Sequence, residues 1–365
     1  MASETMTTRA DPHGSAPTSG PLEWDELKMA YRCPAMPLES LRLPVTPIGQ
    51  HYQVIHWEIP SVDPAAWELV IGGHVDRPRT VDLDALRRKP AVTSRVTLEC
   101  AGNGRGLLEP RPVSAPWLGG AVSTAEWTGT PLGPLLRSAG PSEGAVDVRF
   151  GAVDRGIQGG IEQSFERALP IDEAMLDDVL LAYEMNGAPI PSQHGAPVRL
   201  VVPGWYGMAS VKWLTSIEVL DHRYDGFQNR VAYRYQRDAD DPGEPVARMR
   251  VKSLMAPPGI AEFITEQRVV DAGPVPISGR AWSGSGVISK VEFGVDGEWM
   301  HATLERGNDA IAWRGWTAQW DAAPGEYELT CRATDVTGAT QPLVPEWNYQ
   351  GMGNNAVQRI KVLVR

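Results

Sequence analysis

The stretch "VTLECAGNGR", residues 96–105, joins a strand to a glycine-rich turn and ends in a fixed positive charge. Its apolar residues alternate with polar ones up to Cys100, which is the pattern of a half-buried β-strand. The two glycines that follow let the backbone come close to a ligand and point amide hydrogens at it. We predict that Cys100 and Arg105 lie at the mouth of a loop that favours anions.

The chemistry of Cys100 has several possible interpretations. Arg105 and backbone amides favour the thiolate, which is a nucleophile or a soft metal ligand. A buried core cysteine is the alternative, and it suits Cys331, which lies in an alternating strand. A cysteine hydrolase needs a histidine base, and no Cys-His family signature is present. A zinc site needs a second cysteine two to four residues away, and the sequence has none there. The residues alone leave these choices open.

A second unusual stretch is "QHGAPVRLVVPGWYGMASVKWL", residues 193–214, where His194, Arg199 and Lys212 interrupt segments of buried character. The three residues are either ordinary charges at strand ends or the cradle of an anion. Arginine forks and lysine ammonium groups both suit phosphate. These residues by themselves do not decide between the two interpretations.

Composition limits the class of protein. The 365 residues predict two domains, and the net charge of −11 argues against a nucleic-acid partner. No run of about 18 apolar residues is present, so no membrane span is expected. The three cysteines are odd in number and far apart, which favours a reducing, cytoplasmic setting over a disulfide framework. The polar N-terminus lacks the apolar region of a signal peptide.

Turn and strand patterns divide the chain. Residues 235–249 are rich in Asp, Pro and Gly and are predicted to form a linker. Beyond them, short strands alternate with turns such as Asp296-Gly297, a strong hairpin signal. The predicted parts are a disordered leader (1–21), an irregular α+β domain (22–245) and an all-β immunoglobulin-like sandwich (246–365).

Several long stretches resemble the sulfite oxidase family of molybdenum enzymes. They are "TLECAGNGR", "WLGGAVSTAEWTGTPL", "LLAYEMNGAPIPSQHGAPVRLVVPGWYGMASVKWL", "RAWSGSGVISKVEFGVDGEW" and "WNYQGMGNNAVQRIKV". The resemblance runs from about Pro47 to Arg365. It implies an α+β domain that holds a molybdenum-molybdopterin cofactor and an immunoglobulin-like domain that forms a homodimer. It also implies that Cys100 is the molybdenum ligand, because the pterin dithiolene supplies the other sulfurs.

The resemblance also assigns roles residue by residue. Arg105 faces the anionic substrate, Trp117 walls the pocket, Tyr233 donates a hydrogen bond, and Arg314 is lent to the pocket by the second domain. The residues expected to bind the cofactor are His56, Cys100, Asp154, His194, Arg199 and Lys212.

The implied activity is transfer of an oxygen atom at molybdenum, with sulfite oxidised to sulfate. No haem- or flavin-binding domain is seen in the sequence, so electrons are expected to pass to a separate acceptor, a cytochrome or dioxygen. One alternative is an S-oxide or N-oxide reductase, or an oxidase of another small sulfur compound. Another is a molybdopterin-binding protein without turnover.

One departure from the family pattern concerns the substrate. Sulfite-oxidising relatives place an arginine and an asparagine where this sequence has Val54 and Ile55. A lost arginine removes a charge-assisted contact worth about 1.5–3 kcal/mol. Sulfite would then bind through Arg105 and Arg314, or the pocket would accept a less charged substrate.

Overall fold

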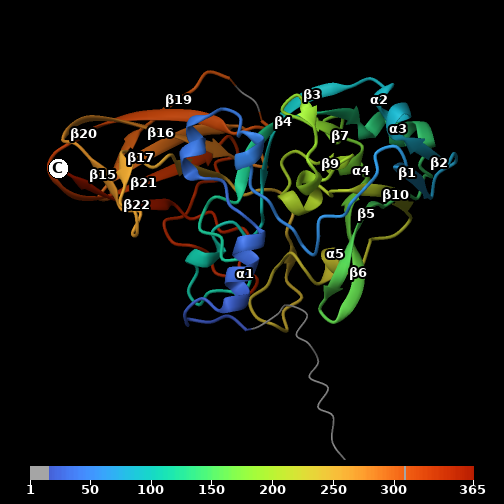
Figure 1. The fold of residues 1–365 in the computed structure, drawn as a ribbon, viewed down its shortest axis with the longest axis horizontal. Helices are drawn as coiled ribbons and strands as arrows, with labels where there is room; N and C mark the ends of the chain where they lie inside the picture. Colours follow the sequence, from blue (N-terminus) through green and yellow to red (C-terminus); the bar gives the residue numbers. More distant parts are fainter. Residues whose placement is uncertain (1–15, 308–309) are drawn as a thin grey trace, which may run out of the picture.

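The structure is a computed structural model that describes residues 16–307 and 310–365. Figure 1 shows the strands of the first domain at one end of the molecule and those of the C-terminal domain at the other. Sheets dominate both parts, and the helices are short. Among the described residues, no helix is long and apolar enough to cross a bilayer.

The first domain contains two mainly antiparallel sheets. One has the order β2 (Arg79–Asp82), β1 (Glu68–Gly73), β10 (Leu214–Leu220), β5 (Asp147–Gln158) and β6 (Ile161–Pro170). The other has the order β3 (Val92–Glu99), β4 (Val122–Pro131), β7 (Leu180–Met185) and β8 (Ala188–Pro189), with β9 (Arg199–Val201) paired to β7. The helices are α1 (Trp24–Arg32), α2 (Leu83–Arg87), α3 (Leu132–Ala139), α4 (Ile171–Ala174) and α5 (Phe227–Arg230).

Strand β3 forms as predicted, but its end is buried on both faces rather than on one, because Thr97 and Glu99 are each 1% exposed. Val96 and Leu98 are fully buried in the core of the first domain, and β3 pairs along its length with β4. The strand ends at Glu99, so Cys100 begins the turn. The Cys100 amide still donates to the Ala121 carbonyl at 2.9 Å, which fixes where the turn leaves the sheet.

The C-terminal domain consists of two sheets that share one apolar core. The first has the order β13 (Lys252–Met255), β16 (Gly273–Trp282), β20 (Arg314–Ala322) and β19 (Thr303–Leu304). The second has the order β14 (Ile260–Ala261), β15 (Arg268–Val270), β22 (Gln358–Val364), β21 (Gly325–Asp335), β17 (Ile288–Val295) and β18 (Glu298–His301). Asp296 and Gly297 have φ of 48° and 89°, which confirms the predicted hairpin between β17 and β18. The all-β character is as predicted, and the immunoglobulin type stays a prediction.

The predicted linker is not a free connection. Two short strands inside it, β11 (Arg234–Tyr235) and β12 (Glu244–Pro245), pair with each other. Val246 and Met249 are buried in the core of the first domain. The abundance of Asp, Pro and Gly reflects tight turns between anchored residues rather than a flexible tether.

The predicted leader is only partly described. Residues 1–15 lie outside the described residues, whereas the following segment is bound to the fold. Thr18 bridges to Arg111, and the Arg111 guanidinium donates to the carbonyls of Gly20 and Pro21 and to the buried Glu26 carboxylate of α1. The predicted boundary at residue 21 therefore falls within a held segment.

Candidate active site

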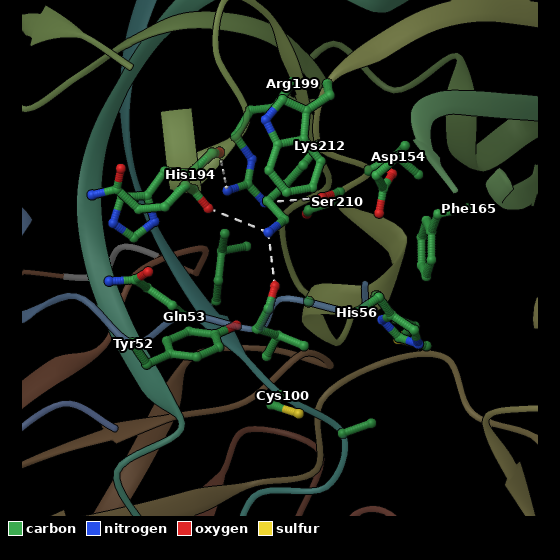
Figure 2. Close-up of a pocket in the computed structure, with 18 of the residues that line it drawn as sticks. Tyr52, Gln53, His56, Cys100, Asp154, Phe165, His194, Arg199, Ser210 and Lys212 are labelled. Carbon is green, nitrogen blue, oxygen red and sulfur yellow. Dashed lines mark hydrogen bonds between the residues drawn. The ribbon is translucent and has the colours of Figure 1, made fainter. Parts of the chain in front are cut away.

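A pocket opens between the end of β3 and the loops that flank β9, with about 730 Å³ of space including the open solvent at its mouth. Seven of the residues singled out in the sequence line it: His56, Cys100, Asp154, His194, Arg199, Lys212 and Tyr233. Figure 2 shows Cys100 on one side of the cavity and Arg199, Lys212 and His194 on the other.

The cysteine loop, residues 99–105, is a tight turn. The Asn103 amide donates to the Cys100 carbonyl at 2.9 Å, and the Arg105 amide donates to the Gly102 carbonyl at 3.0 Å. Gly104 has φ of 86°, a conformation that glycine adopts without strain. A Cβ on Gly102 would lie 2.7 Å from the Arg105 guanidinium, so this glycine leaves room for the charge beside the thiol.

The protonation of Cys100 differs from the prediction. Burial raises the pKa of the thiol, while Arg105 and the Gly102 amide lower it. Both groups therefore act in the predicted direction, but burial outweighs them, so the pKa of the free thiol is raised. A bound cation would shift the balance, because a coordinating thiol loses its proton.

Opposite the thiol lies the cation wall, which we define as Arg199 and Lys212, with the His194 imidazole beside them. The Arg199 guanidinium donates to the carbonyls of His194 and Ser210, each at 2.9 Å, and stacks 4.9 Å from the Trp127 ring centroid. Burial lowers the Arg199 pKa to about 10. Because these hydrogen bonds go to neutral carbonyls, the positive charge stays available to an anion.

Lys212 is held by carbonyl oxygens as well. Its Nζ donates to Val54 at 2.7 Å and to Gln193 at 3.3 Å. Burial lowers the Lys212 pKa to about 7, with Arg199 adding to the shift and Asp154 opposing it. Burial raises the Asp154 pKa to about 6, against the pull of Lys212. A bound anion would raise the Lys212 pKa again and keep its ammonium group charged.

Three histidines complete the polar lining. His51 and His194 stack edge to face at 5.1 Å, and the Nε2 atom of each is buried without a hydrogen-bond partner. Burial lowers the pKa of His194 to about 2 and those of His51 and His56 to about 4, so all three are neutral near pH 7. Buried polar atoms rarely lack a partner. These two nitrogens, the uncompensated cations and the thiol fit a polar, anionic cofactor that carries a soft metal.

Three predicted residues lie outside the pocket lining. Arg105 is buried and its Nη2 contacts the Met352 sulfur at 3.4 Å. Trp117 is buried in the core, and its carbonyl accepts from the Gly106 amide. Arg314 donates to the carbonyls of Glu305 and Ile288.

The expectation for Arg314 was wrong in this geometry. Its neighbour Trp313 packs into the first domain and donates to the Pro44 carbonyl. Because side chains alternate along a strand, Arg314 points the other way, on the face that carries Trp316 into the sandwich core. The structure therefore keeps the Arg314 guanidinium inside the second domain.

Sequence reasoning missed Arg167 of β6. It is buried, and its guanidinium donates to the carbonyls of Gln228 and Val246. It lies 5.6 Å from the ring centroid of Tyr233, a bulky residue with φ of 56°. Arg167 thus holds the segment that places Tyr233, and an arginine in an alternating strand gave no signal of this role. His51 was also missed, although it lies five residues before His56.

The departure at Val54 and Ile55 has a structural counterpart. Val54 lines the pocket and packs against the core of the first domain, and its carbonyl accepts from Lys212 Nζ. Ile55 is buried, and its amide and carbonyl both contact the Cys33 sulfur, at 3.4 and 3.7 Å. The segment is firmly held, and it presents an aliphatic group where the family pattern has a cation.

Comparison with known proteins identifies the class. Residues 56–228 match the family model described as "Oxidoreductase molybdopterin binding domain", and residues 244–365 match the one described as "Mo-co oxidoreductase dimerisation domain". The class is therefore that of the molybdopterin oxidoreductases.

Individual relatives define the family more closely. The chain is 33% identical to sulfite oxidase of Gallus gallus over 342 residues, which cover 86% of this chain and 72% of that protein. It is 34% identical to mitochondrial sulfite oxidase of Homo sapiens, over 88% of this chain and 62% of that protein. The sulfane dehydrogenase SoxCD from Paracoccus pantotrophus superposes with a TM-score of 0.78 at 28% identity, over 89% of this chain and 82% of that chain. The chain belongs to the sulfite oxidase family of molybdopterin-dependent oxidoreductases, as the sequence motifs predicted.

The family also includes enzymes that act on other substrates. The NADH nitrate reductase of Ulva prolifera is 31% identical over 87% of this chain and 40% of that protein. This chain spans about 62% of the length of the mammalian sulfite oxidases that it matches.

Proposed function

We propose that this protein binds molybdenum-molybdopterin and oxidises a small anionic sulfur compound, foremost sulfite, passing electrons to a separate acceptor. The single observation that carries the proposal is the position of the Cys100 thiol, which faces uncompensated cations across one cavity. When bound, the cofactor supplies oxygen-atom transfer coupled to two-electron redox chemistry.

The chain's own residues would divide the work between two walls. His194, Arg199 and Lys212 hold the anionic parts of the pterin, and Asp154 and His56 line the same side. Cys100 supplies the protein thiolate to the metal. The buried Arg105 charge beside it favours an anion near the thiol, and Tyr233 presents a hydroxyl whose pKa burial holds well above its ordinary value. A neutral Tyr233 donates a hydrogen bond to the substrate anion and keeps its own proton.

The test combines metal analysis with turnover. Protein loaded with cofactor is expected to hold about one molybdenum per chain and to reduce ferricyanide when sulfite is added. Cys100→Ser should lose more activity than the roughly 10–100-fold typical of residues one shell further from a metal. Cys331→Ala is the matched control, because Cys331 is buried in the core of the second domain. Wild-type turnover by Cys100→Ser, or bound cofactor without any oxidation, would reject the proposal.

A second candidate substrate is a less charged sulfur compound. Val54 in the pocket wall favours it, and the likeness to a sulfane dehydrogenase supports it. A panel of sulfite and uncharged organic sulfides, assayed with an oxidised dye, separates the two, and organic sulfoxides assayed with a reduced dye test the opposite direction. Faster reduction of the sulfoxides would instead establish the reverse reaction, in which the protein is an S-oxide reductase.

Two further parts of the proposal concern partners and location. We propose that residues 246–365 form a homodimer, which the match to a dimerisation model supports. The electron acceptor is proposed to be a cytochrome or dioxygen. Sedimentation of the purified chain tests the dimer. The cytoplasmic setting expected from the sequence stays a prediction.

A further inference from the structure

The cysteine loop is held chiefly by the second domain. Glu99, the last residue of β3, is 1% exposed. Its Oε1 accepts from Lys252 Nζ at 3.0 Å and from Asn103 Nδ2 at 2.9 Å, and its Oε2 accepts from Trp282 Nε1 at 2.9 Å. Two of the three donors therefore come from strands of the C-terminal domain.

Lys252 is as buried as the carboxylate it meets, at 4% exposed. It lies opposite Trp282 in the pairing of β13 with β16, so one short stretch of sheet supplies both donors. The ammonium also donates to the carbonyl of Asn354 at 2.7 Å and to that of Asn103 at 3.4 Å. Its three acceptors thus include one carbonyl inside the cysteine loop.

Residues after β21 add further contacts to the same loop. The Gly353 amide donates to the Ala101 carbonyl at 2.6 Å, and Asn354 Nδ2 donates to the Gly104 carbonyl at 2.8 Å. Together with the contact between Arg105 and the Met352 sulfur, these bonds give Ala101, Asn103, Gly104 and Arg105 each a partner in the second domain. Asn103 Oδ1 also accepts from the Ala121 amide of the first domain.

We propose that the Lys252–Glu99 pair is a positioning device through which docking of the second domain sets the place of the Cys100 sulfur. A group that orients a metal ligand commonly acts from one shell away, and Glu99 is the residue next to the ligand position. Burying the two charges of this ion pair costs desolvation energy that an apolar pair avoids. A buried ion pair beside the thiol therefore points to a role in orienting the loop rather than in stability alone. The expected effect on turnover rests on the proposed function, whereas the expected effect on the position of the Cys100 thiol does not.

The test measures how exposed the Cys100 thiol becomes. The full chain, purified from cells unable to make molybdopterin, is treated with iodoacetamide, and alkylation of each cysteine is followed by peptide mass spectrometry. Cys33 and Cys331, both buried, serve as internal references. Lys252→Met is expected to raise the alkylation rate of Cys100 about tenfold by loosening the loop.

A control and a double variant separate positioning from stability. Arg268→Gln removes an ion pair to Glu39 that also joins the two domains, and it should leave the rate within about twofold. Glu99→Gln combined with Lys252→Met removes both charges of the pair, so neither is left buried without its partner and the melting temperature should recover. We expect Cys100 to stay reactive in this double variant, because the ammonium's bonds to Asn103 and Asn354 are still missing.

Each result has a stated meaning. An unchanged Cys100 rate in Lys252→Met, a rate in the double variant that recovers together with the melting temperature, or an equal increase in Arg268→Gln would overturn the proposal. If Lys252→Met fails to fold, the double variant carries the test. In cofactor-loaded protein the double variant should lower kcat with little change in KM. If the cofactor-loaded wild-type protein were inactive, the kcat and KM comparison could not be made, but the alkylation result would be unaffected.

Discussion

A lysine lies on each side of the pocket, Lys212 in its lining and Lys252 behind the cysteine loop, and the two are satisfied in opposite ways. Lys252 pairs with the Glu99 carboxylate at 3.0 Å behind the cysteine loop. Lys212 donates to carbonyl oxygens, and burial lowers its pKa to about 7. A charge neutralised within the fold serves architecture, whereas a charge left uncompensated at a cavity is available to a ligand.

The largest expected effect tests this contrast through stability. Lys252→Met leaves the Glu99 carboxylate buried without its cation, which should lower the free energy of unfolding by about 3–5 kcal/mol. Lys212→Met removes a charge that burial already disfavours, so stability should stay the same or rise. Urea denaturation of the two variants at pH 7 measures both. Equal losses would show that the two lysines play the same role.

The next effect concerns the cation wall. Arg199→Met removes a buried charge whose contacts are neutral carbonyls and the Trp127 ring. We expect cofactor capture to weaken roughly 10–100-fold, the range for a lost charge-assisted contact. Fluorescence of bound pterin against added cofactor gives the affinity. Arg268→Gln, which removes an ion pair to Glu39 away from the pocket lining, is the comparison, and a similar loss there would contradict the role of the cation wall.

The pH dependence of cofactor capture follows from Lys212. With its pKa near 7 in the empty pocket, the ammonium deprotonates as pH rises above that value. Affinity for an anion should then fall by about tenfold per pH unit until binding no longer requires the proton. Asp154 titrates near pH 6, and Arg199 stays charged throughout. Lys212→Met should flatten the profile between pH 7 and 9, and a slope that survives in this variant would assign the titration to another group.

Lys212 also makes the stability of the cofactor-free protein depend on pH. Its folded pKa lies below the ordinary value of 10.5, so the unfolded chain binds the proton more readily between pH 7 and 10.5. Stability should therefore rise with pH across that window, and the rise should disappear in Lys212→Met. Thermal melting of cofactor-free protein at several pH values provides the measurement.

The smallest effect tests the substrate side of the pocket. Val54→Arg restores the cation that the family pattern places there, and it should lower the KM for sulfite by about tenfold or less. An uncharged sulfur substrate should not gain. If both substrates respond alike, the aliphatic wall does not set specificity.

Local chemistry explains which parts of the site were predictable. The residues of the cysteine loop lie in one continuous stretch of sequence, and those of the cation wall lie in another. Each group could therefore be recognised from a single motif. The neighbours of Cys100 lower its pKa as predicted, but the larger, opposing effect of burial could not be seen in the sequence. Arg314 was misplaced because Trp313, the residue just before β20, packs into the first domain and the arginine faces the other way.

The sequence alone determined the family, the presence of two units and the strand that ends at Cys100, because each depends on periodicity or on a compact motif. The family resemblance also identified seven of the residues that line the pocket. Only the tertiary structure decided the partners of Glu99, the role of Arg167 and the empty hydrogen-bonding positions of His51 and His194. Those features depend on groups brought together across long separations, such as the 153 residues between Glu99 and Lys252. Burial sets their energetics, and burial is a property of the packed molecule.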